Sequence, residues 1–199
     1  MEKTNKKPKK GLGIIISGPS GVGKGTVINK LLEKNNDFIL SVSYCTRKSR
    51  KHEKNGTDYH FIKVEDFQNM AKNKGFAEWA EVHKNYYGTS MDYISRLVKG
   101  EKIIFEVDVQ GAKNLIALFE KKKYPYISFF LIPPSLSELI NRLENRGTED
   151  PKSLKIRFEN ARKELSDSSY FNYSLINARI DSTVDHIYKL INEKEKKNE

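Results

Sequence analysis

The glycine-rich segment at residues 18–26 constrains the fold of this chain more than any other feature. It follows Leu12–Ser17, a short apolar run rich in isoleucine, and leads into Lys24–Glu33, a stretch with helical spacing. A short continuous apolar run is typical of a buried strand. Between a strand and a helix, glycines let backbone N–H groups turn toward phosphate oxygens, and the helix adds its positive N-terminal end. The segment therefore predicts a site for a nucleoside triphosphate.

This phosphate loop consists of Gly18, Pro19, Ser20, Gly21, Val22, Gly23, Lys24, Gly25 and Thr26. We expect Lys24 to reach the β- and γ-phosphates. Gly25 departs from the strict pattern, in which a Ser or Thr hydroxyl binds Mg²⁺. We therefore expect phosphates, water and a distant carboxylate to hold Mg²⁺. Asp108, directly or through water, is the first candidate and Glu106 the second. GTPases, helicases and kinases share such loops, so the motif alone does not identify the reaction.

Strand and helix patterns alternate along most of the chain. Further strands are predicted at Phe38–Ser43, Tyr59–Ile62, Lys102–Asp108, Tyr126–Ile132 and Tyr173–Ile176. Further helices are predicted at Val64–Asn73, Gln110–Lys122, 152–166 and Val184–Ile191. Ser135 precedes another helix, and Glu138 three residues later predicts a capping box. This alternation predicts an α/β fold whose parallel sheet is covered by helices on both faces.

Residues 43–100 interrupt the alternation, so we expect an insert with its own small sheet. The core is then 11–42 and 101–199, and the whole of 11–199 is one domain. A polar segment with a glycine, at about 142–157, lies between predicted helices and is typical of a lid. The many lysines of residues 1–10 predict a disordered basic tail.

The formal net charge of +10 is compatible with two classes of partner, nucleic acid and small polyanions such as nucleotides. No nucleic-acid-binding module is recognisable, so we expect nucleotides and no nucleic acid. The single cysteine, Cys45, cannot form an internal disulfide, which favours a reducing compartment and hence the cytoplasm. No apolar run approaches the ~20 residues of a membrane span, so we expect no membrane partner. The sequence carries no signal for an oligomeric state.

Two arginines follow the second predicted strand. Arg47 and Arg50 are three residues apart, close enough to grip one phosphate together. Guanidinium groups match the geometry of phosphate better than point charges do. Clusters of arginine and lysine are also common on solvated surfaces, so this pair alone does not decide between the two interpretations.

Four more motifs follow in order: GTDYHF at residues 56–61, FAEWAE at 76–81, NYYGT at 85–89 and FEVDVQG at 105–111. Together with the phosphate loop and the arginine pair, this series closely resembles the guanylate kinase family, from about Leu12 to Ile191. The resemblance implies a P-loop NTPase core with a GMP-binding insert and a helical lid. It also implies an enzyme that transfers the γ-phosphoryl group of ATP to GMP, and to dGMP, with Mg²⁺ present.

The resemblance further implies roles for individual residues. The positions that bind GMP are Ser43, Arg47, Arg50, Tyr59, Glu78, Tyr87, Thr89 and Asp108. Among these, the arginines and tyrosines hold the phosphate, Glu78 and Thr89 read the base, and Asp108 faces the same pocket. The catalytic positions are Lys24, Arg50, Arg142, Arg146 and Arg157, of which the last three surround the lid. Asn177 matches a position beside the adenine of ATP. Glu106 stands where the family often has Asp, which leaves its role open.

The chemistry of Glu78 supports the choice of guanine. Guanine presents N1–H and N2–H₂ as adjacent donors, and one carboxylate can accept from both. Adenine presents an unprotonated N1 there, and each unmet buried polar group costs about 1–3 kcal/mol. The acceptor phosphate is already anionic, so catalysis needs positioning and charge stabilisation rather than a nucleophilic side chain.

Three other functions are compatible with parts of the sequence. Some guanylate-kinase-like domains are protein-interaction modules without catalysis, but the phosphate loop through Lys24 and the lid arginines favour an enzyme. A kinase for a different acceptor is disfavoured by Glu78 and Thr89. A nucleic-acid binder is suggested by the charge alone.

Overall fold

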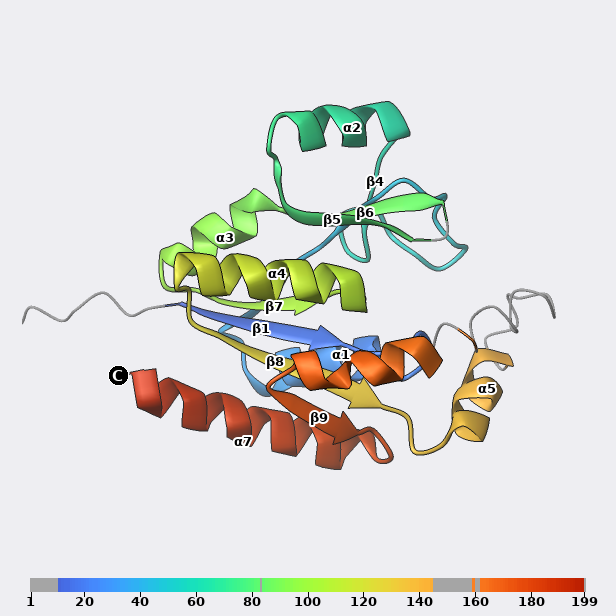
Figure 1. The fold of residues 1–199 in the computed structure, drawn as a ribbon, viewed down its shortest axis with the longest axis vertical. Helices are drawn as coiled ribbons and strands as arrows, with labels where there is room; N and C mark the ends of the chain where they lie inside the picture. Colours follow the sequence, from blue (N-terminus) through green and yellow to red (C-terminus); the bar gives the residue numbers. More distant parts are fainter. Residues whose placement is uncertain (1–10, 83, 145–158, 160–161, 199) are drawn as a thin grey trace, which may run out of the picture.

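The computed structural model describes residues 11–82, 84–144, 159 and 162–198, and a five-stranded parallel sheet forms the centre of this part (Figure 1). Its strands are β1 (Leu12–Ser17), β2 (Phe38–Leu40), β7 (Lys102–Glu106), β8 (Tyr126–Ile132) and β9 (Tyr173–Ile176). They lie in the order β2-β7-β1-β8-β9, and every neighbouring pair is parallel. The predicted α/β fold with a parallel sheet is confirmed.

Helices cover both faces of this sheet. These helices are α1 (Lys24–Lys34) and α7 (Ile180–Asn198) on one face, and α3 (Met91–Val98) and α4 (Val109–Lys122) on the other. Ile14 and Ile16 of β1 pack with α1 and α7, whereas Ile15 packs with α3 and α4. Successive side chains of a strand point to opposite faces, so β1 contributes to both apolar clusters. The phosphate loop therefore starts from the best buried strand of the core.

A second sheet lies within residues 43–100. Its strands, in spatial order, are β4 (His60–Phe61), β3 (Tyr44–Cys45), β6 (Asn85–Ser90) and β5 (Phe76–Val82). Helix α2 (Val64–Lys72) lies over it (Figure 1). The Phe67 ring of α2 stacks on Phe76 and Tyr86, with centroid distances of 4.4 and 5.4 Å. These aromatic contacts hold α2 on the sheet.

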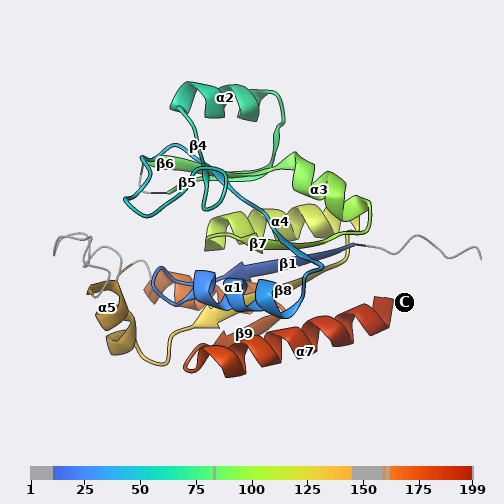
Figure 2. The same cartoon turned by 180° about the vertical axis from the view of Figure 1, so that it is seen from behind.

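Helix α4 lies between the two sheets, as both views of the ribbon show (Figures 1 and 2). Asp108 caps its N-terminus, because its Oδ1 accepts a hydrogen bond from Gly111 N at 2.7 Å. A Cβ atom on Gly111 would lie 2.9 Å from Glu78 Oε2 of β5, so any larger residue here would require the Glu78 carboxylate to shift. The C-terminal ends of β1 and β7 therefore face the small sheet, and ligands of parallel α/β folds bind at such ends.

Several element boundaries differ from the prediction. The strand predicted at Phe38–Ser43 ends at Leu40, because Val42 N turns away to the Tyr93 hydroxyl at 3.0 Å. The strand predicted to end at Asp108 ends at Glu106, because Asp108 caps the following helix. The final helix is longer than predicted and spans Ile180–Asn198. Helix α3 and the individual strands β5 and β6 were not predicted from the sequence.

The helix after Pro133-Pro134 is α5 (Leu136–Glu144). Ser135 Oγ accepts from Glu138 N at 3.0 Å, as the predicted cap requires. The Glu138 carboxylate accepts from Arg142 Nε at 2.9 Å, instead of from Ser135 N as a complete capping box requires. The tail at 1–10 and most of the lid predicted at about 142–157 lie outside the described residues. Within the described part of the chain, no helix combines the length and apolarity needed to cross a membrane.

Candidate active site

The phosphate loop joins β1 to α1, as its sequence predicts. Gly18 has a φ of +143°, and a Cβ there would lie 2.5 Å from Leu131 O, so the turn requires glycine. The loop is closed by a hydrogen bond from Val22 N to Pro19 O at 3.2 Å. Lys24, the first residue of α1, donates from Nζ to Gly18 O at 2.7 Å. Its ammonium group therefore lies against the loop, at the positive end of the helix.

A cavity of about 270 Å³ lies between the phosphate loop, the C-terminal end of β7 and the small sheet. The predicted residues that line it are Gly18, Ser20, Gly21, Gly23, Lys24, Gly25, Ser43, Arg47, Arg50, Tyr59, Glu78, Tyr87, Glu106 and Asp108. They come from widely separated parts of the chain. The cavity thus brings the phosphate loop and the residues expected to bind the acceptor into one space.

Glu78 is a buried acid in the wall of this cavity, and only 8% of it is exposed. Thr89, its partner across β5 and β6, is fully buried and donates its hydroxyl to Glu78 Oε1 at 2.7 Å. The pKa of Glu78 is raised to about 7: burial is the largest cause, the hydrogen bond from Thr89 opposes it, and the negative charge of Asp108 adds to it. A buried carboxylate in this state gains stability from a ligand that supplies N–H donors.

Two arginines and two tyrosines form a further part of the cavity wall. The Arg47 guanidinium lies over the Tyr59 ring, 4.9 Å from its centroid, and the Tyr59 and Tyr87 rings meet edge to face at 6.0 Å. Burial raises the pKa of both tyrosines, so their hydroxyls stay protonated at neutral pH and can donate. The Arg50 side chain is 50% exposed. This wall is rich in donors and positive charge, which suits a phosphate group.

Some predicted residues do not line the cavity in this structure. Of the phosphate loop, these are Pro19, Val22 and Thr26, and of the other predicted positions they are Thr89, Arg142 and Asn177. Asn177 is 1% exposed, and its Nδ2 donates to Val22 O at 2.8 Å. Arg142 also donates to Val22 O, from Nη1 at 3.3 Å. Both side chains therefore contact the backbone of the phosphate loop. Arg146 and Arg157 lie outside the described residues.

Two carboxylates near the cavity were missed by the sequence analysis. Glu53 pairs with Arg47, and nothing in a spacing of six residues within a polar segment predicts that pair. Glu164 lines the cavity, and burial raises its pKa to about 6, against the lowering effect of Lys24 and with a further rise from Asp108. Glu164 follows two basic residues in a polar helical stretch, and nothing in that pattern distinguishes it from a surface acid.

Known proteins are similar to this chain over most of its length. The family model for guanylate kinase matches residues 10–194. The guanylate kinase of Prochlorococcus marinus subsp. pastoris is 43% identical over 180 residues, which are 89% of this chain and 95% of that protein. The guanylate kinase of Clostridium acetobutylicum is 43% identical over 185 residues, which are 92% of this chain and 86% of that protein.

A solved structure is similar as well. The crystal structure of guanylate kinase from Anaplasma phagocytophilum has a TM-score of 0.77 and 32% identity to this chain, and the match covers 94% of this chain and 87% of that one. Its fold has the same P-loop NTPase core that the phosphate loop and the parallel sheet form here. The chain therefore belongs to the guanylate kinase family.

Proposed function

We propose that this protein transfers the γ-phosphoryl group of ATP to GMP, which yields ADP and GDP. The observation that carries the proposal is a cavity whose lining combines the phosphate loop and Lys24 with Glu78 and two arginines. ATP is the co-substrate and GMP the acceptor. We extend the proposal to dGMP, because none of the assigned contacts needs the ribose 2′-hydroxyl.

The reaction follows from this placement. Glu78 would accept hydrogen bonds from N1–H and N2–H₂ of guanine, while Thr89 holds the carboxylate from behind through its hydroxyl. Arg47 and Arg50, with the two tyrosines, would hold the acceptor phosphate. An oxygen of that phosphate attacks the γ-phosphorus of ATP, and the bond to the β–γ bridging oxygen breaks. Lys24 would offset the charge on the transferring group, so catalysis is positioning and electrostatic stabilisation.

The residues present fit a magnesium ion bound mainly by nucleotide. Among the described residues, no group of three or more His, Cys, Asp or Glu side chains could hold a metal ion. Mg²⁺ commonly uses one or two carboxylates together with substrate phosphates and water. Asp108 would be the carboxylate, directly or through water, although its Oδ1 already accepts from Gly111 N. When bound, Mg²⁺ would supply positive charge to the phosphates.

We also propose that three parts of the chain have separate roles. Residues 43–100 would be the GMP-binding insert on a core of 11–42 and 101–199, and residues 142–157 would be a lid. Arg142, Arg146 and Arg157 would come together around the transferring phosphoryl group when the lid closes. Closure would exclude water, which otherwise competes with GMP as the acceptor.

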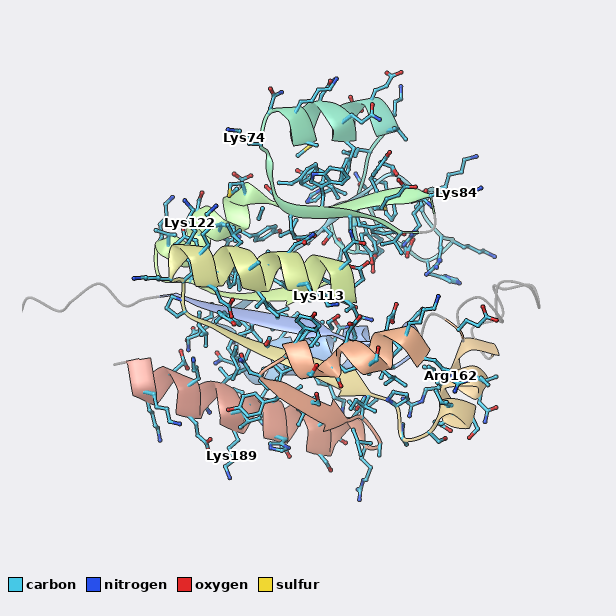
Figure 3. The ribbon with its side chains drawn as sticks, viewed as in Figure 1. Lys74, Lys84, Lys113, Lys122, Arg162 and Lys189 are labelled. Carbon is cyan, nitrogen blue, oxygen red and sulfur yellow. The ribbon has the colours of Figure 1, made fainter. Side chains whose placement is uncertain are left out.

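The positive charge is better explained by nucleotides than by nucleic acid. Figure 3 shows the labelled basic residues at separate places, with Lys74 and Lys84 at opposite ends of the small sheet, Lys122 on α4 and Lys189 on α7. A nucleic-acid-binding protein gathers such residues into one patch or stripe. The cytoplasm remains our proposed location, and it is supported by the single cysteine, which favours a reducing compartment.

The products test the proposal directly. The purified protein is incubated with ATP, GMP and Mg²⁺, and the nucleotides are separated by chromatography. Formation of ADP and GDP in equal amounts is expected, with little ADP when GMP is omitted. ADP formation without GDP would mean hydrolysis instead of transfer, and would contradict the proposal.

Glu78→Gln is expected to weaken the preference for guanine. The amide keeps the size of the side chain but presents an NH₂ donor to a guanine N–H, so GMP should lose about 1–3 kcal/mol of transition-state binding. AMP should lose nothing, because the amide can donate to adenine N1. The ratio of kcat/KM for GMP over AMP should therefore fall about tenfold or more. Glu81→Gln, an exposed change on the same strand, is the control. An unchanged ratio would mean that the base is read elsewhere.

The KM for GMP is expected to rise as the pH falls through about 7, because burial raises the pKa of Glu78 to about 7. Protonation removes one acceptor from the carboxylate, so the form that binds guanine is the charged form, present above that pKa. The second ionisation of a phosphate group, near pH 6, adds its own dependence. Glu78→Gln retains only the phosphate dependence, so the pH profile of the ratio between variant and wild-type KM isolates Glu78. A flat ratio would contradict the assignment.

A further inference from the structure

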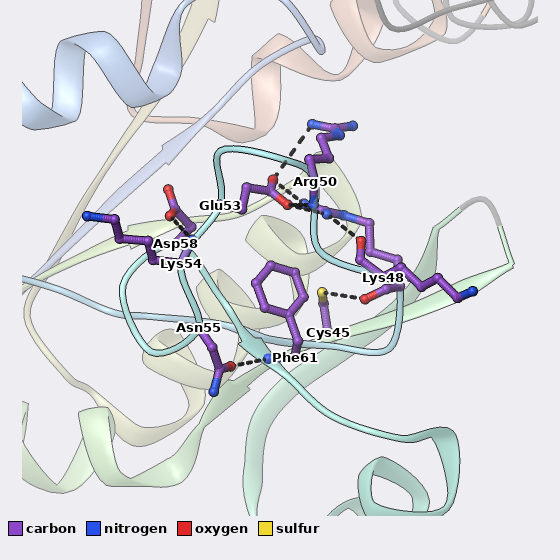
Figure 4. Close-up of polar contacts among 9 residues, drawn as sticks. Cys45, Lys48, Arg50, Glu53, Lys54, Asn55, Asp58 and Phe61 are labelled. Carbon is purple, nitrogen blue, oxygen red and sulfur yellow. Dashed lines mark hydrogen bonds and ion pairs between the residues drawn. The ribbon is translucent and has the colours of Figure 1, made fainter.

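Glu53 lies in the loop between β3 and β4, next to Arg50 (Figure 4). It accepts two hydrogen bonds from the Arg47 guanidinium, Oε2 from Nη1 at 2.6 Å and Oε1 from Nη2 at 2.7 Å. The same carboxylate accepts from Arg50 N at 2.8 Å, and Arg50 Nη1 lies 3.9 Å from Oε1. One side chain therefore holds both the Arg47 guanidinium and the backbone that carries Arg50.

Glu53 stands behind the arginines as seen from the cavity. Arg47 and Arg50 line the cavity, whereas Glu53 is not among the lining residues. The Glu53 side chain is 15% exposed although it belongs to a polar surface loop. Its own backbone N–H donates to Arg50 O at 3.0 Å, which closes the turn. A carboxylate so placed supports the arginines from the far side and leaves the cavity to a ligand.

The remaining contacts of Arg47 fix the direction of its guanidinium. Its Nη1 also donates to Lys48 O at 3.1 Å, and its plane lies over the rings of Tyr59 and Phe61 at 4.9 and 5.5 Å. Glu53 and Lys48 together take both N–H groups of Nη1 and one N–H of Nη2, and the guanidinium also hydrogen-bonds Tyr87 of the cavity wall. The hydrogen bond to Arg47 lowers the pKa of Glu53, which therefore stays charged at neutral pH.

We propose that Glu53 is a positioning residue that sets the arginine grip for the acceptor phosphate before GMP binds. The inference rests on the proposed function, because it assigns Glu53 a task in binding the phosphate of GMP. The alternative is that Glu53 occupies the place of the phosphate and must be displaced by it. Preorganised donors bind a ligand more tightly because their order is established before binding. Positioning therefore predicts that loss of Glu53 weakens GMP binding, and competition predicts that it strengthens GMP binding.

The experiment compares wild type, Glu53→Gln, Glu53→Asp and the control Glu65→Gln, an exposed change on α2. Glu53→Gln presents an NH₂ group to Arg47, so the KM for GMP should rise about tenfold or more. Neither kcat at saturating GMP nor the KM for ATP should change more than about threefold, because Lys24 and Arg50 are retained. Glu53→Asp keeps the charge and should give a smaller rise. Equilibrium dialysis with GMP alone should show the highest affinity for the wild type, a lower one for Glu53→Asp and the lowest for Glu53→Gln.

Each outcome has a distinct meaning. A lower KM for GMP in Glu53→Gln would show competition and overturn the inference, and so would an unchanged KM. If Glu53→Gln does not fold, judged by its circular dichroism, Glu53→Asp decides in the same way. If the wild type phosphorylates GMP and both Glu53 variants have the wild-type KM for GMP, only this inference is overturned. A wild type without GMP turnover overturns the proposed function first.

Discussion

Lys24→Ala is expected to lower kcat for GMP phosphorylation about 10³-fold or more. Loss of a positioned cation at a transferring phosphoryl group has effects of this size in related reactions. In the structure, Lys24 lies at the N-terminus of α1 with its ammonium group against the phosphate loop. The alanine retains helical propensity, so the helix should persist. Steady-state and single-turnover rates with saturating ATP and GMP measure the loss.

The control for this change is Lys189→Ala, which removes the same charge from the exposed face of α7. Both variants should retain the wild-type circular dichroism spectrum, and the control should retain wild-type turnover. The helix dipole and the loop backbone remain in Lys24→Ala, so ATP binding should weaken less than turnover. Near-normal turnover by Lys24→Ala would mean that the phosphate loop does not act in phosphoryl transfer as we propose.

Arg50→Ala is expected to reduce GMP turnover by a factor of order 10², the usual result of losing a positioned charge. The Arg50 side chain lines the cavity and is half exposed, and its Nη1 lies 3.9 Å from the Glu53 carboxylate. Arg47, by contrast, is held by Glu53 through two short hydrogen bonds. Arg47→Ala should therefore act mainly by raising the KM for GMP, because the Arg47 guanidinium is held in place for binding, whereas the Arg50 side chain is half exposed.

Lys51→Ala is the matched control, because Lys51 is the exposed neighbour of Arg50 in the same loop and carries the same charge. Its kinetics should match the wild type. Kinetics of GMP phosphorylation are compared at saturating ATP for all three variants. If Arg50→Ala and Arg47→Ala both left the GMP kinetics unchanged, the phosphate of the acceptor would have to bind elsewhere.

The features that the sequence predicts well are those fixed by neighbours in the chain. The strand Leu12–Ser17, the loop that follows and the start of α1 at Lys24 agree with the structure because glycine conformation and apolar runs act locally. The alternation of strands and helices along the chain likewise agrees with the parallel α/β fold, whereas the spatial order of the strands was not predicted. Strand ends were less certain, since Asp108 could extend β7 or cap α4, and only the packed structure decides.

The features that the sequence could not predict depend on contacts between distant segments. Thr89 is expected to contact the base, but the sequence does not predict that its hydroxyl donates to Glu78, which depends on the register between β5 and β6. The resemblance places Asn177 beside the adenine of ATP, and the sequence does not predict that its amide also donates to Val22 O. The link from Glu53 to Arg47 needs the turn that brings them together, and residue spacing alone does not specify that turn.

The central claim is that one cavity receives ATP and selects GMP as the acceptor. The most direct measurement is the initial rate of ADP formation by the wild-type protein with GMP, AMP, CMP and UMP in parallel, at equal concentrations and with Mg²⁺. A site built around hydrogen bonds to its substrate rejects analogues that lack the donors by several orders of magnitude. We predict that kcat/KM for GMP exceeds that for each other acceptor by about 10³-fold or more. Equal rates with AMP, or no ADP formed with any of the four, would contradict the account.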